Sequence, residues 1–369
     1  MLVSAGRYYE AALGALGKFR LNLGALMRAA VFNGPGEKLA IESRPVPQPD
    51  LGELLLKVAY CGICGSDLHA TQEGAFLQPK GVILGHEFSA EVSASAAEGW
   101  SVGDRVVGIP IVECDDCRAL GQCRLGLGMA CARAKVIGLN PSAPGAYAEF
   151  VKIRASKTLR VPDDLDLKIA ALAEPIAVAA HAIRKAGPLF GARVLIIGAG
   201  PIGLAVLLCA MFAGVTSVSV SELDDARGLR AREFGATHVF NPGKDEVRRA
   251  YYKRFGAAPL VVFECVGAKG LLQQAIDCCA PGGSVVVVGV CVHDDVIKPF
   301  SAITKELRIQ FALGYDTDDF VTALELLGSN RVDSEKLITR VIDMEELPDT
   351  FEELRKPNSH AKVLLRPSA

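Results

Sequence analysis

The residues VLIIGAGPIG at Val194–Gly203 join an apolar strand to the glycine pattern GxGxxG, and the apolar helix LAVLLCAMFAG follows at Leu204–Gly214. The first glycine of such a loop permits a tight turn, the second lets the backbone approach a pyrophosphate, and the third lets helix pack on strand. The helix N-terminus then faces the phosphates of a dinucleotide. The loop residues expected to bind it are Gly198, Gly200, Pro201, Ile202 and Gly203.

An acidic residue ends the next expected strand, SVSVSE, at the position where this motif usually places one. Glu222 lies nineteen residues beyond Gly203, and a carboxylate there accepts hydrogen bonds from the adenosine ribose and repels a 2′-phosphate. The pattern therefore favours NAD over NADP. Arg227 complicates this prediction, because its guanidinium could serve a phosphate, stack on adenine or cap a helix. A glycine-rich turn without a ligand is the alternative.

Working outward from the loop, the chain changes character twice. Residues 175–313 alternate expected strands and helices, which indicates a doubly wound parallel sheet. Residues 27–161 hold short β-like runs bounded by Gly, Pro or Asp, and the tail carries one helix and a late strand that return to this lobe. The predicted class is α/β, with a catalytic domain at 27–175 plus 317–369, a dinucleotide-binding domain at 176–316, and a disordered extension without a role at 1–26.

Composition excludes several partners. The 369 residues are half apolar and carry 40 basic against 42 acidic side chains, a formal charge of −2, so nucleic acid and membrane are not expected partners. The uncharged run Val194–Ser221 is long enough to span a bilayer, but glycines and a proline interrupt it. Eleven cysteines, six of them in metal-ligand spacings between Cys61 and Cys131, and no clean signal peptide favour a reducing cytoplasm.

Two residues point to a metal. Catalytic zinc is held by about three protein ligands with one open position, and Cys64 and His86 are the obvious pair, since both lie beside glycines and charged residues. Glu87 and Glu174 are candidate carboxylate ligands. Glu174 lies in the apolar stretch ALAEPIAVAAHAI, where a lone carboxylate would be costly unless it met a cation.

Four further cysteines predict a second zinc site. A CxxC pair followed by two more cysteines on a glycine-rich loop is the arrangement of a closed structural site. These residues are Cys114, Cys117, Cys123 and Cys131.

The motifs CGICGSDLH (Cys61–His69), GHE (Gly85–Glu87), AEP (Ala173–Pro175) and GAGPIG together resemble the zinc-containing medium-chain dehydrogenases, especially the branch of sorbitol, threonine and butanediol dehydrogenases. The resemblance extends from Met27 almost to the end. It implies a GroES-like β-rich catalytic domain beside a Rossmann domain. In the family the third cysteine of the lobe comes three residues sooner than here.

The resemblance also implies roles for single residues. Cys64, His86 and either Glu174 or Glu87 would bind catalytic zinc, with the carboxylates exchanging as substrate enters. Ser66 and His69 would relay the substrate proton, and Asp67 would orient His86. Val266, Gly289 and Leu313 would approach the nicotinamide.

The implied reaction moves hydride between NAD and a secondary alcohol or polyol, with zinc as a Lewis acid. The alternatives are a zinc-free quinone or enone reductase of the same superfamily, and a non-enzymatic protein that binds zinc and dinucleotide. A small-molecule alcohol is the expected partner. A homo-dimer or homo-tetramer is also expected, and the strand SVVVVGV at Ser284–Val290 is one candidate for joining two sheets.

Overall fold

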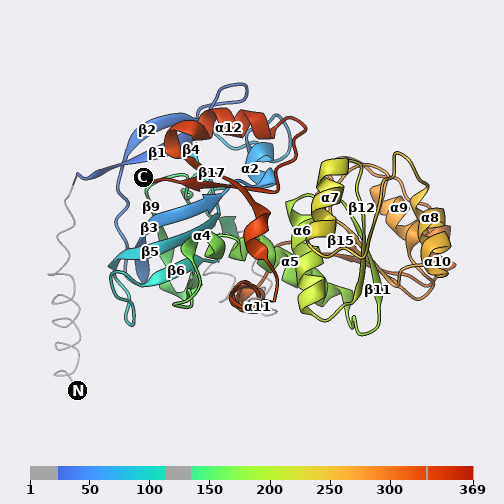
Figure 1. Ribbon diagram of the computed structural model, residues 1–369. Helices are drawn as coiled ribbons and strands as arrows, with labels where there is room; N and C mark the ends of the chain where they lie inside the picture. The colour runs from blue at the N-terminus through green and yellow to red at the C-terminus, as the bar shows by residue number, and fades with distance from the viewer. Residues whose placement is uncertain (1–23, 113–133, 330, 369) are drawn as a thin grey trace, which may run out of the picture.

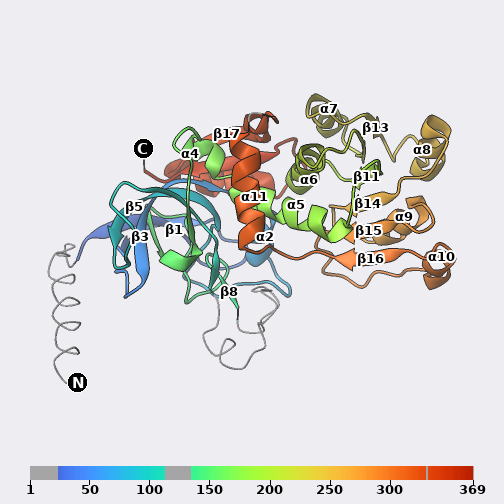
Figure 2. The ribbon, with the colours of Figure 1, turned by 90° about the horizontal axis from the view of Figure 1, so that it is seen from below.

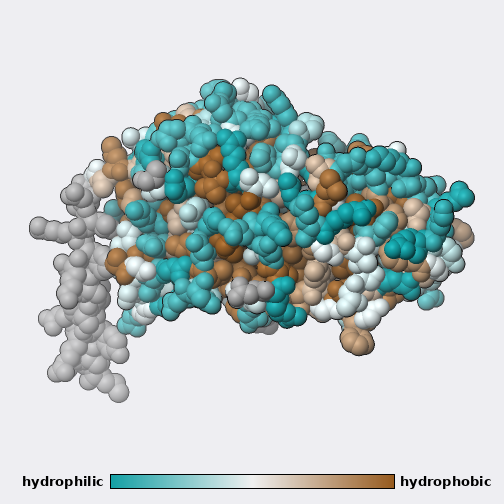
Figure 3. Space-filling model, viewed as in Figure 1, coloured by the Kyte–Doolittle hydropathy of each residue, from teal (hydrophilic) through white to brown (hydrophobic). Residues whose placement is uncertain are grey.

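The structure is a computed structural model that describes residues 24–112, 134–329 and 331–368. Figure 1 shows two lobes side by side, a β-rich lobe that carries both the first strand and the C-terminal end, and an α/β lobe formed by the middle of the chain. This is the predicted α/β class. On the face in Figure 3, hydrophilic residues cover most of both lobes, and apolar residues gather near the middle.

The strands of the β-rich lobe are mostly antiparallel, and the end of the chain returns to this lobe as the parallel pair β17 and β18. One sheet has the order β2-β1-β4, and a larger one has β10-β6-β5-β3-β18-β17 with β9 paired to β3. The bounds are β1 Leu26–Phe32, β2 Ala40–Pro45, β3 Glu53–Gly62, β4 Val82–Ile83, β5 Glu87–Ser95, β6 Arg105–Gly108, β9 Phe150–Arg154, β10 Thr158–Arg160, β17 Ile338–Asp343 and β18 Lys362–Arg366. A small hairpin pairs β7 (Ile111–Val112) with β8 (Lys135–Val136). The expected return of the tail to this lobe is therefore present.

The α/β lobe is a six-stranded parallel sheet in the order β13-β12-β11-β14-β15-β16. Its strands are β11 Arg193–Ile197, β12 Ser217–Ser221, β13 His238–Phe240, β14 Val261–Glu264, β15 Ser284–Val287 and β16 Arg308–Phe311, and the helices between them are α6 Pro201–Phe212, α7 Asp225–Glu233, α8 Val247–Phe255, α9 Leu271–Cys278 and α10 Pro299–Ile303. Successive strands are added in one direction from β11 to β13 and in the opposite direction from β14 to β16, so the crevice at the carboxyl ends of β11 and β14 is the expected ligand position.

Alternation along β11 explains why the sheet is covered on both faces. Val194 and Ile196 pack into the core that contains α6, whereas Leu195 and Ile197 pack into the core that contains α8 and α9. Successive side chains of a strand point to opposite faces, so a strand that is apolar throughout needs helices on both sides. The uncharged run Val194–Ser221 divides into β11, α6 and β12. Among the described residues, no helix has the length and apolar character needed to cross a membrane.

Two helices occupy the junction of the lobes. Figure 2 shows α11 (Thr317–Gly328) packed across α5 (Ala173–Ala186) between the β-rich and α/β lobes. Both helices contribute to the same core as α6. The predicted boundary after Pro175 falls inside α5, so this helix belongs to both lobes, and the domain limits remain a prediction.

The strand at Ser284–Val290 does not have the position needed to join two sheets. Its ordered part, β15, pairs with β14 on one side and β16 on the other. The outermost strand at this end is β16, whose residues are mostly exposed. An interior strand has no free backbone edge for a second copy, so the free edge of the sheet at this end belongs to β16.

Candidate active site

The register of two strands brings three of the predicted ligands together. Strand β3 ends at Gly62, which lies opposite Glu87, the first residue of β5. Cys64 then caps the short helix α2 (Gly65–Ala70), and His86 immediately precedes β5. The ligand atoms of Cys64, His86 and Glu87 all lie within 4.8 Å of one another. A thiol, an imidazole and a carboxylate grouped in this way fit a zinc ion.

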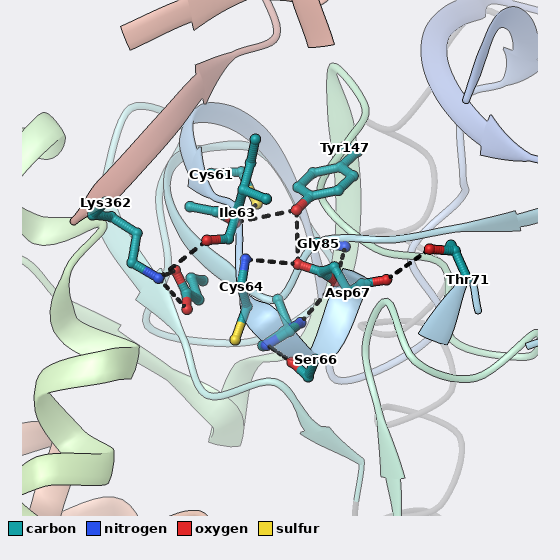
Figure 4. A network of polar contacts seen from close by, with 12 residues as sticks. Cys61, Ile63, Cys64, Ser66, Asp67, Thr71, Gly85, Tyr147 and Lys362 are labelled. Carbon is teal, nitrogen blue, oxygen red and sulfur yellow. Dashed lines mark hydrogen bonds and ion pairs between the residues drawn. The ribbon is translucent and has the colours of Figure 1, made fainter. Parts of the chain in front are cut away.

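Asp67 is the hub of the polar network behind these ligands (Figure 4). It is fully buried, and its Oδ2 accepts hydrogen bonds from the Cys64 amide (3.0 Å) and the Tyr147 hydroxyl (2.7 Å). Its Oδ1 accepts from the Gly85 amide at 3.3 Å. Burial raises the pKa of Asp67, but the neighbouring His86 and these hydrogen bonds outweigh it, so the pKa lies below the usual range.

His86 faces Asp67 with one ring nitrogen and Ser66 with the other. Its Nδ1 lies 3.4 Å from Asp67 Oδ1, yet among the described residues no acceptor meets it with hydrogen-bond geometry. Its Nε2 lies 3.2 Å from Ser66 Oγ. Burial lowers the pKa of His86, and the adjacent Asp67 carboxylate reverses this and raises it well above the usual value. A small movement of the ring therefore suffices to make the oriented imidazole that zinc sites use.

Glu87 is held by a buried lysine. The Nζ of Lys362, on β18, lies 2.7 Å from both carboxylate oxygens of Glu87 and donates to the Ile63 carbonyl at 3.2 Å. Glu87 and Lys362 are 0% and 3% exposed. Burial lowers the pKa of Lys362, but the charge of Glu87 more than restores it, so the pKa is raised. Gly62 is required here, because a Cβ at that position would lie 2.1 Å from Glu87 Oε2.

Glu174 stands at the margin of this group. It lies in the first turn of α5 and is buried, with the Tyr315 side chain close by. Burial raises the pKa of Glu174 to about 7, and the charge of Glu87 adds to the effect while His86 opposes it. The positive groups near Glu174 are His86, which has the larger effect on its pKa, and Lys362, whose direct partner is Glu87. The structure thus brings Cys64, His86 and Glu87 together. Glu174 lies near enough for the charges of His86 and Glu87 to shift its pKa.

The two expected relay residues lie on α2. Ser66 is half-buried beside His86, and His69 is exposed three residues later. Residues three apart in a helix share a face, so the pair runs from the ligand group to solvent. The relay itself remains a prediction.

The glycine loop has the geometry that its sequence requires. A Cβ on Gly203 would lie 2.0 Å from the Gly198 carbonyl oxygen, so helix α6 packs against the loop at a distance that only glycine permits. A Cβ on Gly200 would meet nothing within 4 Å, which leaves open space where the pyrophosphate belongs. Glu222 follows β12, and its carboxylate accepts from the amides of Ala199 (2.7 Å) and Asp224 (2.9 Å). The acid thus lies against the loop, as a ribose ligand should.

The residues expected near the nicotinamide lie at one edge of the sheet. Val266, Gly289 and Leu313 each lie two residues beyond the end of β14, β15 and β16, respectively. Val266 and Leu313 are at least half exposed, and so accessible to a ligand. Arg227 is engaged elsewhere, because its guanidinium donates to the Asn358 carbonyl at 3.1 and 2.7 Å. Its assignment to the cofactor stays a prediction.

Some site residues lie outside the described part of the chain, and two others were not predicted. The second zinc site, Cys114, Cys117, Cys123 and Cys131, lies outside the described residues. Tyr147 and Lys362 were missed. A lysine inside the apolar strand AKVLL was the signal for the second, whereas nothing about GAYAEF distinguishes Tyr147 from an ordinary core aromatic residue.

Comparison with known proteins identifies the family. Residues 50–163 match the alcohol dehydrogenase GroES-like domain, and residues 201–329 match the zinc-binding dehydrogenase domain. Human sorbitol dehydrogenase is 32% identical over 338 residues, which are 88% of this chain and 92% of the human protein. The chain belongs to the zinc-containing medium-chain alcohol dehydrogenase family. Family membership confirms the predicted resemblance, fold class and enzyme class, and makes the non-enzymatic alternative wrong.

Solved structures of the same family agree with the whole architecture. The (2R,3R)-butanediol dehydrogenase of Bacillus subtilis is 32% identical with a TM-score of 0.84, covering 93% of this chain and 100% of that one. A zinc-binding dehydrogenase of Sinorhizobium meliloti, bound to NADP, is 30% identical with a TM-score of 0.86 and the same coverage. This alcohol dehydrogenase therefore binds a nicotinamide dinucleotide of the NAD(P) kind.

Proposed function

We propose that this enzyme transfers hydride between NAD and a secondary alcohol or polyol, with zinc held by Cys64, His86 and Glu87. The observation that carries the proposal is the approach of the three ligand atoms to within 4.8 Å of one another. A zinc-free quinone or enone reductase has no use for such a group. The names of the relatives, a sorbitol dehydrogenase and a butanediol dehydrogenase, support secondary alcohols and polyols as the substrate class.

The cofactors supply the chemistry and the chain supplies position. When bound, zinc would supply a Lewis acid for the substrate oxygen, and NAD would supply the hydride acceptor. Asp67 orients His86 and the Cys64 backbone, and Lys362 fixes Glu87. Ser66 accepts the substrate proton and passes it toward exposed His69. The edge formed by Val266, Gly289 and Leu313 would hold the nicotinamide ring beside the substrate.

The test is alcohol-dependent reduction of NAD across diols, sugar alcohols, threonine and cyclic secondary alcohols. We expect activity with at least one of these and its loss when a chelator removes zinc. Chelator-resistant reduction of quinones by NADPH, without alcohol oxidation, would instead establish the zinc-free reductase.

Glu222 is proposed to select NAD over NADP. Its carboxylate is fixed beside the loop by two backbone amides, and Arg227, the residue available to neutralise a 2′-phosphate, is bound to Asn358. We expect the KM for NADP to exceed that for NAD by about tenfold or more, equivalent to about 1.4 kcal/mol. Steady-state kinetics with both cofactors measures this ratio, and Glu222→Ala should reduce it. A lower KM for NADP in the wild-type enzyme would refute the assignment.

We further propose that a second copy of the chain joins this one along β16. This strand, and not the one at Ser284–Val290, is then the candidate for joining the sheets of two subunits. Within the described residues β16 pairs on one side only, and exposed apolar side chains lie on β16, just beyond it and on the preceding helix α10. These side chains are Phe300, Ile303, Phe311 and Leu313. Light scattering during size-exclusion chromatography should give a dimer or tetramer, and Ile309→Pro should shift it toward monomer, because proline interrupts strand pairing. A monomeric wild-type protein would contradict the proposal.

The cytoplasmic location also remains a proposal.

A further inference from the structure

Tyr147 is locked into the wall of the metal site by the backbone around it. The segment 145–147 runs alongside residues 83–85, with amide-to-carbonyl distances of 2.8 Å from Gly145 to Ile83, 2.8 Å from Ala146 to Gly85 and 2.9 Å from Tyr147 to Leu84. The ring lies directly over Gly85, since a Cβ there would lie 2.4 Å from Tyr147 Cδ1. The residue that follows Gly85 is the candidate ligand His86. The ring and this ligand are therefore built on one rigid unit.

Packing does not require the hydroxyl group of this side chain. Tyr147 is 0% exposed, and its ring meets Phe351 of α12 (Leu347–Leu354) edge to face with centroids 6.4 Å apart. A phenylalanine would satisfy these contacts, and a buried hydroxyl is costly unless it is hydrogen-bonded. The hydroxyl donates to Asp67 Oδ2 at 2.7 Å, and its one other acceptor within the described part of the chain, the Gly62 carbonyl, lies at 3.5 Å. Its function must therefore be sought at Asp67.

The hydroxyl determines how the Asp67 carboxylate is oriented. Oδ2 is held from two directions, by Tyr147 and by the Cys64 amide, which leaves Oδ1 facing Gly85 and the His86 ring (Figure 4). Without the hydroxyl, the Cys64 amide alone would hold Oδ2, and the carboxylate could turn about its χ2 torsion. Both candidate ligands depend on this orientation, Cys64 through its backbone and His86 through its ring.

We propose that Tyr147 is a positioning residue for zinc, which acts by fixing Asp67 so that Cys64 and His86 are preorganised for the metal. The inference rests on the proposed zinc site and adds to it a residue that contacts no metal, substrate or cofactor. Partners of this outer kind typically change metal affinity by 10-fold to 100-fold. For a residue that acts through Asp67, the lower end of this range is expected.

The test measures zinc affinity and folding stability separately in Tyr147→Phe. Zn²⁺ is titrated into the metal-free full chain in competition with a chromophoric chelator, and thermal unfolding of the metal-free protein is followed in parallel. The zinc that Cys64→Ser still binds is counted as zinc bound at other sites. Tyr251→Phe is the matched control, because Tyr251 is similarly buried, at 1% exposed, but lies on α8 in the other lobe, away from the candidate ligands. Asp67→Asn provides the upper limit of the effect.

We expect Tyr147→Phe to weaken zinc binding by about tenfold, Tyr251→Phe to leave it unchanged, and Asp67→Asn to weaken it at least as much as Tyr147→Phe. Equal zinc affinity in Tyr147→Phe and wild type, whether or not its metal-free unfolding temperature falls, would overturn the role of Tyr147 and leave the proposed function intact. If wild type binds no more zinc than Cys64→Ser, the proposed function fails and the inference fails with it.

Discussion

Replacing Cys64 with serine is expected to reduce alcohol oxidation below detection and to lower the bound zinc by about one ion per chain. The serine hydroxyl stays protonated at neutral pH and is a poor zinc ligand, whereas a thiolate is among the best. The neighbouring candidate ligands His86 and Glu87 remain, but two ligands hold zinc much less firmly than three. Metal analysis after gel filtration and an NAD-linked assay measure the two effects.

The control for this variant is a cysteine that takes no part in the site. Cys278 is buried in α9 of the α/β lobe, so Cys278→Ala should keep both the metal and the activity. A Cys64→Ser enzyme that retained normal zinc and turnover would remove Cys64 from the ligand set.

The second large effect is expected from Lys362→Met. This change leaves the Glu87 carboxylate buried without its cation, and removing one partner of a buried ion pair typically destabilises a protein by about 3–5 kcal/mol. Unfolding of the metal-free protein should therefore occur at clearly lower denaturant concentration than in wild type. Chemical unfolding followed by fluorescence in the presence of chelator measures the shift without any contribution from zinc.

A double variant separates the charge effect from lost packing. Adding Glu87→Gln removes the unpaired charge, so Lys362→Met/Glu87→Gln should recover much of the stability lost in the single variant. Lys38 provides the surface control, because its pair with Asp349 is exposed and Lys38→Met should leave unfolding unchanged. Similar unfolding of Lys362→Met and wild type would mean that the Glu87 carboxylate does not depend on Lys362.

The fold was predictable because its signals are local. In VLIIGAGPIG a buried strand, three glycines and a helix follow one another directly, and the structure shows β11, the loop and α6 in that order. The late strand AKVLL was also recognisable, as β18. Its neighbours were not, because the pairing of β18 with β3 depends on contacts between residues about 300 positions apart. The same limit led to the wrong candidate strand for joining two sheets, since apolarity marks burial and does not distinguish an interior strand from an edge.

The ligand site was predictable only in part, for a related reason. Cys64, His86 and Glu87 lie within 24 residues and carry distinctive neighbours, so the sequence points to them directly. Their supports come from distant parts of the chain, Tyr147 from the segment beside Gly85 and Lys362 from the last strand. An aromatic residue between small residues and a lysine in an apolar run each have commoner explanations. Only the folded arrangement shows that the hydroxyl group reaches Asp67 and that the ammonium group reaches Glu87.

The position of α5 has a mechanical consequence. Glu174 lies in its first turn, beside the ligands, while the remainder of the helix packs into the core shared with α6. The packing of the helix therefore fixes the position of the Glu174 carboxylate. Because α5 packs against both lobes, a change in the angle between them would shift the Glu174 carboxylate relative to Cys64, His86 and Glu87, and would so couple the arrangement of the lobes to the charge around the candidate metal site.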